Sequence, residues 1–411
     1  SSSAASDVYK RQLLSVFASC SKDPELEPDT PPSTFKVRID NVIHETYFDS
    51  YPQGPSLFVP YLVMSGLPEG EKLLAFGGYY SPENPNPDGS DYTFIHDCAD
   101  DELIQGWDWT QELIYSAGWI DLPIPGKTYY FKGVVRTNKA VYYSNTVTIN
   151  TDGLPGYTPG PQDRVLPVVF HVMPRKDGTY PHPYFFDEML ACANRLYRNV
   201  WPLPGLADAG IRFVPATHAP DGTALSTPGI HYLDERYELD LDISNEELRQ
   251  WVGDNLWEMT EVINVWVSPF INDHIVSEDT STAGFTFLPY FAPEEMLQGC
   301  NTAVPGCFSG IFLNQEIVGN GYCNSGIAVF AHEAGHYLGL DHVFEEDWCD
   351  DTPQYDRARY RTEQYIPGID TYLRYPIDAS AEPYTALNVM DYDIVIYSGI
   401  TPQQAERVRY T

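Results

Sequence analysis

Positive charge is scarce in this chain of 411 residues, in which 24 lysines and arginines stand against 58 aspartates and glutamates. The resulting formal net charge of −34 repels the phosphates of nucleic acids and the headgroups of anionic membranes. Long apolar runs are absent as well, and none approaches the roughly 20 residues that a transmembrane helix needs. We therefore exclude nucleic acid as a partner and expect a globular protein, long enough for two or three domains.

Cysteine is also sparse, with seven in the chain, and the first of them has a distinctive setting. Cys20 follows a short apolar stretch, residues 13–19, that ends in small side chains. This setting resembles the end of a bacterial lipoprotein signal, in which Cys20 would be the lipid-modified residue. The acidic, proline-rich residues 21–29 then predict a disordered tether, similar to the signal that sends some lipoproteins to the outer cell surface. Residues 1–34 therefore predict a lipid anchor and an outer-membrane or cell-surface location, with a plain secretory signal or a chance apolar patch as alternatives.

The first domain-sized region, residues 35–150, has the signals of β-structure. Its clearest strands, residues 128–136 and 141–149, are rich in β-branched and aromatic side chains and are joined by a short turn. The pair resembles the last two strands of an immunoglobulin-like or fibronectin type III-like sandwich, a module that commonly serves as a spacer or a docking surface. Residues 151–163, with glycine or proline at almost every second position, predict a linker.

From residue 164 to residue 411 the pattern changes to alternating strands and helices. Short apolar runs predict buried strands, and amphipathic stretches predict helices between them. The expected strands are residues 165–173, 211–214, 262–267, 284–288 and 310–314. The expected helices include residues 185–200 and one that opens with a capping box at residues 244–247. The fold class expected for the whole chain is therefore an all-β sandwich followed by an α+β domain.

One run in this second region carries the chemistry: H-E-x-x-H-x-x-G-x-x-H, made by His332, Glu333, His336, Gly339 and His342. Residues four apart share a helix face, so His332 and His336 can bind one ion together. Glu333 lies about 100° around the helix, near enough to reach a water molecule on the metal. Gly339 can take the left-handed conformation that ends the helix and returns His342 toward the same ion.

Three imidazole nitrogens and one open position are the ligand set of a catalytic zinc site. At this chain's composition, the eleven-residue pattern would arise by chance in roughly one sequence in tens of thousands. The alternative is an ordinary buried helix whose histidines are satisfied by protein groups. The sequence thus predicts one catalytic Zn²⁺ held by His332, His336 and His342, with Glu333 as the general base.

The same run resembles the signature of the metzincin clan of zinc endopeptidases. A second segment supports the resemblance: Met390, within Asn-Val-Met-Asp-Tyr at residues 388–392, resembles the clan's Met-turn beneath the metal. Together with Cys-Asp-Asp-Thr-Pro at residues 349–353, this segment looks most like the pappalysin-type family, although no cysteine follows Cys349. The resemblance covers residues 164–411 and implies a metzincin-type zincin fold for them.

The resemblance also implies roles for residues outside the histidine run. Tyr392 would hydrogen-bond the oxyanion of the tetrahedral intermediate, with core packing as the alternative. An extended peptide would add itself to the edge strand above the cleft, whose residues are Gly284, Phe285, Thr286 and Phe287. A strand that merely completes the sheet is the other interpretation.

The other cysteines and an acidic cluster predict further bonds. An even set of six cysteines in an exported protein favours disulfides. Six cysteines allow 15 connectivities. The pair that spacing favours most is Cys300–Cys307 around a local loop, and Cys323 and Cys349 bracket the active-site helix, so a bridge between them is a second candidate. The acidic cluster either binds Ca²⁺ through its oxygens or forms a solvated loop; it comprises Glu345, Glu346, Asp347, Asp350 and Asp351.

These observations predict a secreted or surface-anchored, monomeric zinc endopeptidase that cleaves protein or peptide substrates through a water molecule activated by Glu333. Two other interpretations stay open. The chain could be a surface adhesin or binding lipoprotein whose zinc domain is inactive, or a zinc hydrolase that acts on something other than peptide. The intact Glu333 and the third histidine favour an active enzyme, and the edge strand favours a peptide substrate.

Overall fold

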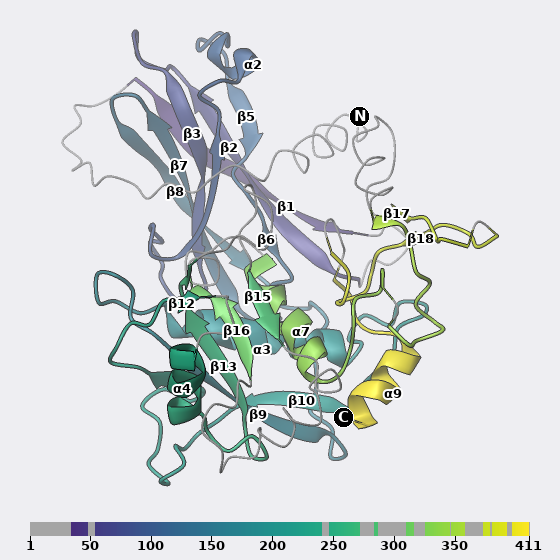
Figure 1. Cartoon of the computed structure of the whole chain (residues 1–411). Helices are drawn as coiled ribbons and strands as arrows, with labels where there is room; N and C mark the ends of the chain where they lie inside the picture. The colour runs from purple at the N-terminus through teal and green to yellow at the C-terminus, as the bar shows by residue number, and fades with distance from the viewer. Residues whose placement is uncertain are drawn as a thin grey trace.

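The computed structural model describes residues 34–47, 54–240, 246–271, 283–286, 310–315, 325–345, 347–357, 373–378, 380–392 and 397–410. Figure 1 shows two parts, a β-rich part built from the first strands and an α+β part that holds the remaining elements. The following predicted residues lie outside the described ranges: Cys20, Phe287, Cys300, Cys307, Cys323 and Glu346. No helix in the described ranges is long and apolar enough to span a bilayer.

The N-terminal part consists of two antiparallel sheets that pack face to face. One contains β1 (Lys36–Thr46), β2 (Ser56–Ser65), β5 (Leu113–Ser116) and β6 (Ile120–Asp121). The other has the order β4 (Tyr92–Asp97), β3 (Leu73–Ser81), β7 (Thr128–Thr137) and β8 (Val141–Asn150), and the short α2 (Glu102–Gln105) follows β4 in the chain. A Cβ on Gly133 of β7 would come within 2.4 Å of the Leu62 side chain of β2, so the sheets are in direct contact. The predicted β-region is confirmed; its immunoglobulin or fibronectin type III character stays a prediction.

The α+β part is organised around a six-stranded sheet. Its order is β10 (Ile211–Pro215), β9 (Arg164–Val172), β13 (Ile263–Ser268), β16 (Ile311–Asn314) and β15 (Gly284–Thr286), and β11 (Ile230–Tyr232) also pairs with β9. β13 is apolar along most of its length because it is buried throughout. β15 pairs antiparallel with β16 at the edge of the described sheet, the place that the family resemblance implied for this strand.

Two short ladders and several helices complete this part. The ladders join β12 (Leu239–Asp240) to β14 (Phe270–Ile271) and β17 (Leu373–Arg374) to β18 (Tyr384–Thr385). Within the described ranges, the helices of the α+β part are α3 (Pro183–Tyr197), α4 (Glu246–Asn255), α7 (Ser325–Tyr337) and α9 (Pro402–Tyr410). Helix α7 buries an apolar stripe at three- and four-residue steps, which includes Ile327, Phe330 and Ala334. It packs against α3, where the Tyr197 hydroxyl donates to the Ala331 carbonyl at 2.9 Å.

The two parts are joined along α3 by buried polar contacts. Glu188 of α3, which is 2% exposed, accepts hydrogen bonds from the Tyr92 hydroxyl at 2.5 Å and the Tyr129 hydroxyl at 2.7 Å. On the same helix, the Tyr184 hydroxyl donates to the Asp91 carboxylate at 2.8 Å. Because a buried polar group without a partner is costly, these bonds fix how the sandwich sits on α3.

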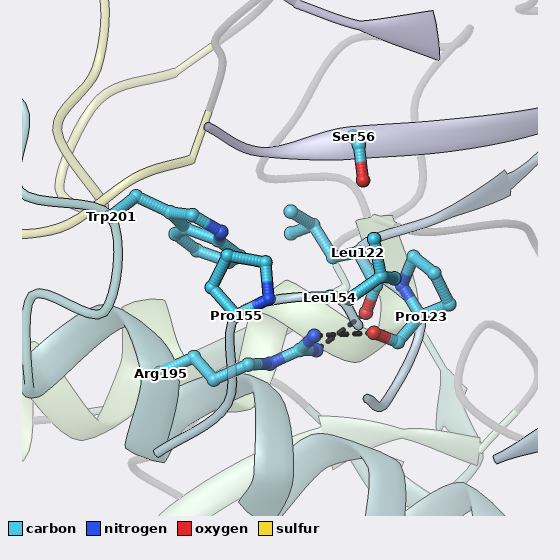
Figure 2. A pocket seen from close by; sticks show the side chains of 7 residues that line it. All are labelled: Ser56, Leu122, Pro123, Leu154, Pro155, Arg195 and Trp201. Atoms are coloured by element: carbon cyan, nitrogen blue, oxygen red, sulfur yellow. Dashed lines mark hydrogen bonds between the residues drawn. The ribbon is translucent and has the colours of Figure 1, made fainter. Parts of the chain in front are cut away.

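Arg195 makes a second contact at this boundary, and its side chain is 3% exposed. Figure 2 shows its guanidinium donating to the carbonyl oxygens of Leu122 and Pro123, which follow β6. The indole ring of Trp201 lies 5.6 Å from the same guanidinium, and Pro155 of the predicted linker lines the same small cavity. The end of the sandwich, the linker and α3 therefore meet at one buried point.

Candidate metal centre

Helix α7 presents His332 and His336 one turn apart, with ring centroids separated by 4.9 Å. The two residues are 8% and 7% exposed, respectively. His332 Nδ1 lies 2.7 Å from the Val389 carbonyl oxygen, and His336 Nδ1 lies 2.8 Å from that of Leu340. These contacts place a proton on each Nδ1 and leave the lone pair on Nε2. His332 Nε2 is buried and has no hydrogen-bond partner among the described residues, as expected of a metal ligand.

A glycine turn after α7 returns the third histidine to this site. Gly339 has a φ of 86°, in the left-handed region that the sequence predicted. The Leu340 N–H bonds to the Gly335 carbonyl at 2.9 Å, which closes a turn of the Schellman type. The chain then brings His342 Nε2 to 3.1 Å from His336 Nε2.

The three imidazoles form a ligand set that suits zinc. One nitrogen from each of His332, His336 and His342 lies within 4.8 Å of the other two. Burial lowers the pKa of His332 to about 3 and that of His342 to about 2, and it also lowers the pKa of His336. The rings are therefore neutral at physiological pH and offer lone pairs to a metal without first losing a proton.

Glu333 lies beside this cluster and is also buried. Burial raises the pKa of its carboxyl to about 8, and the hydroxyl of Thr286 opposes that rise. A Cβ on Gly284 would lie only 2.9 Å from Glu333 Cγ, so β15 passes directly against the predicted base. The structure thus brings the predicted edge strand and the predicted base together.

Met390 is fully buried under the zinc-binding helix, as expected of a Met-turn. A Cβ on Gly335 would lie 2.2 Å from Met390 Sδ and 2.8 Å from the Tyr197 hydroxyl. The glycine between the two helical histidines therefore makes room for the methionine beneath them. The Met-turn also supplies the Val389 carbonyl that orients His332.

Tyr392 lies at the histidine cluster. Its ring centroid is 4.4 Å from that of His342 and 5.2 Å from that of His332. Phe344 stacks on His342 at 4.9 Å, and the Arg357 guanidinium lies 4.6 Å from the Tyr392 ring. These two neighbours were not predicted, because nothing in their local sequence distinguishes them from other aromatic or basic residues.

Two other predictions fare differently. Cys349 is a free thiol among the described residues, as are Cys98 and Cys192. Its expected partner Cys323 lies outside the described residues, as do Cys300 and Cys307, so both bridges stay predictions. A disulfide depends on the distance and direction of the two Cβ atoms, which spacing in the sequence does not give. Burial raises the pKa of the Cys349 thiol to about 12, which keeps it protonated and unreactive.

The acidic cluster proposed for calcium does not gather its carboxylates around one point within the described residues. Asp347 accepts from the Cys349 N–H and the Thr352 hydroxyl. Asp351 accepts from the Thr401 hydroxyl and the Gln403 N–H at the start of α9. The described acidic group with metal-binding geometry instead shares His342 with the zinc site and comprises Asp341, His342 and Glu345.

The comparison with known families concerns the second half of the chain. Residues 246–411 match the model of the peptidase M43 family, which is described as "Pregnancy-associated plasma protein-A". The matched segment contains the histidine run and the Met-turn. No curated protein matches the chain.

Among solved structures, mirolysin in complex with a compound aligns at 19% identity over 60% of this chain and 91% of that chain, with a TM-score of 0.45. Mature mirolysin of Tannerella forsythia in complex with a cleaved peptide aligns at 19% identity over 61% of this chain and 92% of that chain, with a TM-score of 0.44.

Proposed function

Because residues 246–411 are a pappalysin-type metzincin domain of the peptidase M43 family of zinc metalloendopeptidases, we propose that the chain hydrolyses peptide bonds in extended protein or peptide substrates. One observation carries the proposal. Three neutral imidazoles face one another, while a buried carboxylate and a tyrosine border the same point. This is the arrangement that metal-assisted hydrolysis of an amide requires.

The roles follow from position and charge. A zinc ion held by His332, His336 and His342 would polarise the scissile carbonyl and lower the pKa of a water molecule. Glu333 takes the proton from this water and passes it to the leaving amine. Burial raises the pKa of the Glu333 carboxyl, and the positive charge of a bound zinc ion would lower it again, toward the range in which a carboxylate can both accept and return a proton. Tyr392, beside His342, donates a hydrogen bond to the oxyanion.

Substrate binding is assigned to β15. The strand lies at the edge of its sheet, and within the described residues it pairs with β16 alone. An extended peptide can pair with such an edge through backbone hydrogen bonds. Since Gly284 is in contact with Glu333, a peptide on this edge lies next to the base.

The location and assembly of the protein are proposals from sequence alone. We propose that Cys20 carries a lipid that anchors the protein to the outer cell surface, and that the protein acts as a monomer. Replacing Cys20 with Ser should move the protein from the membrane fraction to the soluble fraction. A protein that fractionates as before would contradict the anchor and favour plain secretion.

Incubating the purified protein with a peptide library, with and without a zinc chelator, tests the proposed activity. We expect cleavage that the chelator abolishes and that added Zn²⁺ restores. If the zinc-loaded protein cleaves no peptide, the proposal is overturned and the binding-lipoprotein interpretation is favoured. Mass spectrometry of the products would also define the preferred cleavage site.

A further inference from the structure

A buried ionic network lies immediately after the Met-turn. Arg374 of β17 is 0% exposed and Asp391 is 1% exposed, and Arg374 Nε lies 3.0 Å from Asp391 Oδ2. The second carboxylate oxygen of Asp391 accepts a hydrogen bond from the Tyr355 hydroxyl at 2.5 Å. The three side chains come from separate stretches of the irregular segment that follows α7.

The network holds Tyr392 at both of its backbone groups. The Tyr392 N–H donates to Asp391 Oδ1 at 2.7 Å, and Arg374 Nη2 donates to the Tyr392 carbonyl at 2.9 Å. The direction in which the Tyr392 side chain leaves the backbone is therefore fixed by these two bonds. Val389, three residues earlier, is the residue whose carbonyl orients His332.

A buried ion pair is an expensive way to gain stability. The desolvation cost of the two charges commonly equals or exceeds their attraction, and an apolar replacement would often stabilise a core as well. What an arginine adds is geometry, because its planar fork can hold a carboxylate and a carbonyl in fixed directions. Here the arginine holds the backbone of Tyr392, whose ring centroid lies 4.4 Å from that of His342.

We propose that Arg374 is a positioning residue for catalysis. Through Asp391 and the Tyr392 backbone, it holds the Tyr392 hydroxyl where the oxyanion forms. This inference rests on the proposed function, since it takes Tyr392 to be the oxyanion donor. In this role Arg374 acts through Tyr392.

A double-mutant cycle tests the proposal, with the variants Arg374→Lys, Tyr392→Phe and their combination, all loaded with zinc. Loss of an oxyanion donor commonly costs about 100-fold in kcat, which we expect for Tyr392→Phe. Arg374→Lys keeps the charge but loses the fork, and should lower kcat about 10-fold with little change in KM. In the Tyr392→Phe background, the same change should lower kcat by less than about 2-fold, because the donor that Arg374 positions is already gone.

Arg195→Lys is the matched control, since Arg195 is equally buried and also donates to backbone carbonyls, at the boundary with the sandwich. It should lower the melting temperature and leave kcat unchanged in both backgrounds. Zinc content, measured by elemental analysis, should be the same in every variant. If Arg374→Lys does not fold, Tyr355→Phe removes one bond to Asp391 and should show a smaller kcat effect with the same dependence on Tyr392.

The outcomes separate the two proposals. A wild-type protein without peptidase activity refutes the proposed function. If the wild type is active and Tyr392→Phe lowers kcat, equal losses from Arg374→Lys in both backgrounds show a purely structural arginine and overturn the inference. An unchanged kcat in Arg374→Lys overturns it as well.

Discussion

Glu188 at the boundary between the two parts and Asp391 after the Met-turn are both buried carboxylates that accept hydrogen bonds from tyrosine hydroxyls. For both, burial raises the pKa, and the hydroxyls oppose that rise. They differ in what they hold. Glu188 joins side chains of the sandwich to α3, whereas Asp391 forms an ion pair with Arg374 and accepts a hydrogen bond from the N–H of Tyr392.

The comparison shows that similar buried chemistry can serve different ends. At the boundary, the bonds link residues 96 and 59 positions apart in the chain. Their loss therefore weakens the contact between the sandwich and α3. After the Met-turn, the bonds orient Tyr392 beside the histidines, so their loss would shift the Tyr392 hydroxyl by a small distance. Changes at the first site should appear mainly in stability, and changes at the second mainly in kcat.

The largest effect on activity is expected at Glu333, which belongs to neither network. Glu333→Gln keeps the size of the side chain but cannot take a proton. Cleavage of a peptide substrate should fall by about 10³- to 10⁴-fold, while zinc content and melting temperature stay close to those of the wild type. Retained cleavage would refute the assignment of Glu333 as the base.

Glu382→Gln is the control for this change. Glu382 is an exposed carboxylate of the same part of the chain, so its neutralisation removes one negative charge without touching the site. Its activity should equal that of the wild type. A comparable loss in both variants would point to a general effect of charge.

Glu188→Ala should produce the largest loss of stability. It leaves the hydroxyls of Tyr92 and Tyr129 buried without their acceptor, at a cost of about 1–3 kcal/mol for each unsatisfied group. Chemical denaturation measures this loss, with the exposed Glu83→Ala as control. The kcat of the folded variant should be unchanged. A fall in kcat without a fall in stability would remove the distinction between the two networks.

Asp121, at the end of β6, gives the boundary a dependence on pH. Burial raises the pKa of Asp121 from 3.8 to about 7, so the folded protein binds this proton more tightly than the unfolded chain. The stability that the proton contributes is complete below about pH 4 and is lost as the pH rises to about 7. Asp121→Asn removes the titration, so the fall in melting temperature between pH 5 and pH 7 should be smaller than in the wild type. Equal falls in both proteins would show that Asp121 ionises freely.

The zinc site was largely predictable from the sequence because its information is local. Helical periodicity places His332 and His336 on one face, and Gly339 adopts the positive φ that returns His342. The supporting bonds are not local. Arg374 and Asp391 are 17 positions apart, in a segment without helical or strand periodicity, and no pattern marks either as a partner of the other.

The same reason explains what was missed at the boundary between the two parts. The sequence predicted a sandwich and a linker, and nothing in it distinguished the buried Glu188 from the exposed carboxylates of an acidic chain. Pairing between distant residues depends on the tertiary fold, which spacing does not encode. Cys349 illustrates this, since its place in the sequence suggested a bridge to Cys323, whereas the positions of the two Cβ atoms decide whether one forms.

The smallest effect on kcat is expected at Thr286 of β15, the strand proposed to bind the substrate. The Thr286 hydroxyl oxygen and Glu333 Oε2 are both buried without a hydrogen-bond partner within the described residues, and the hydroxyl opposes the rise in the Glu333 pKa. Thr286→Val keeps the shape of the side chain without the hydroxyl, so the pKa of Glu333 should rise further and kcat at neutral pH should fall by about 2- to 10-fold. Thr286→Ser restores a hydroxyl and should recover most of this loss. If serine and valine behave alike, β15 contributes only its backbone and its shape, and the support of the base comes from burial alone.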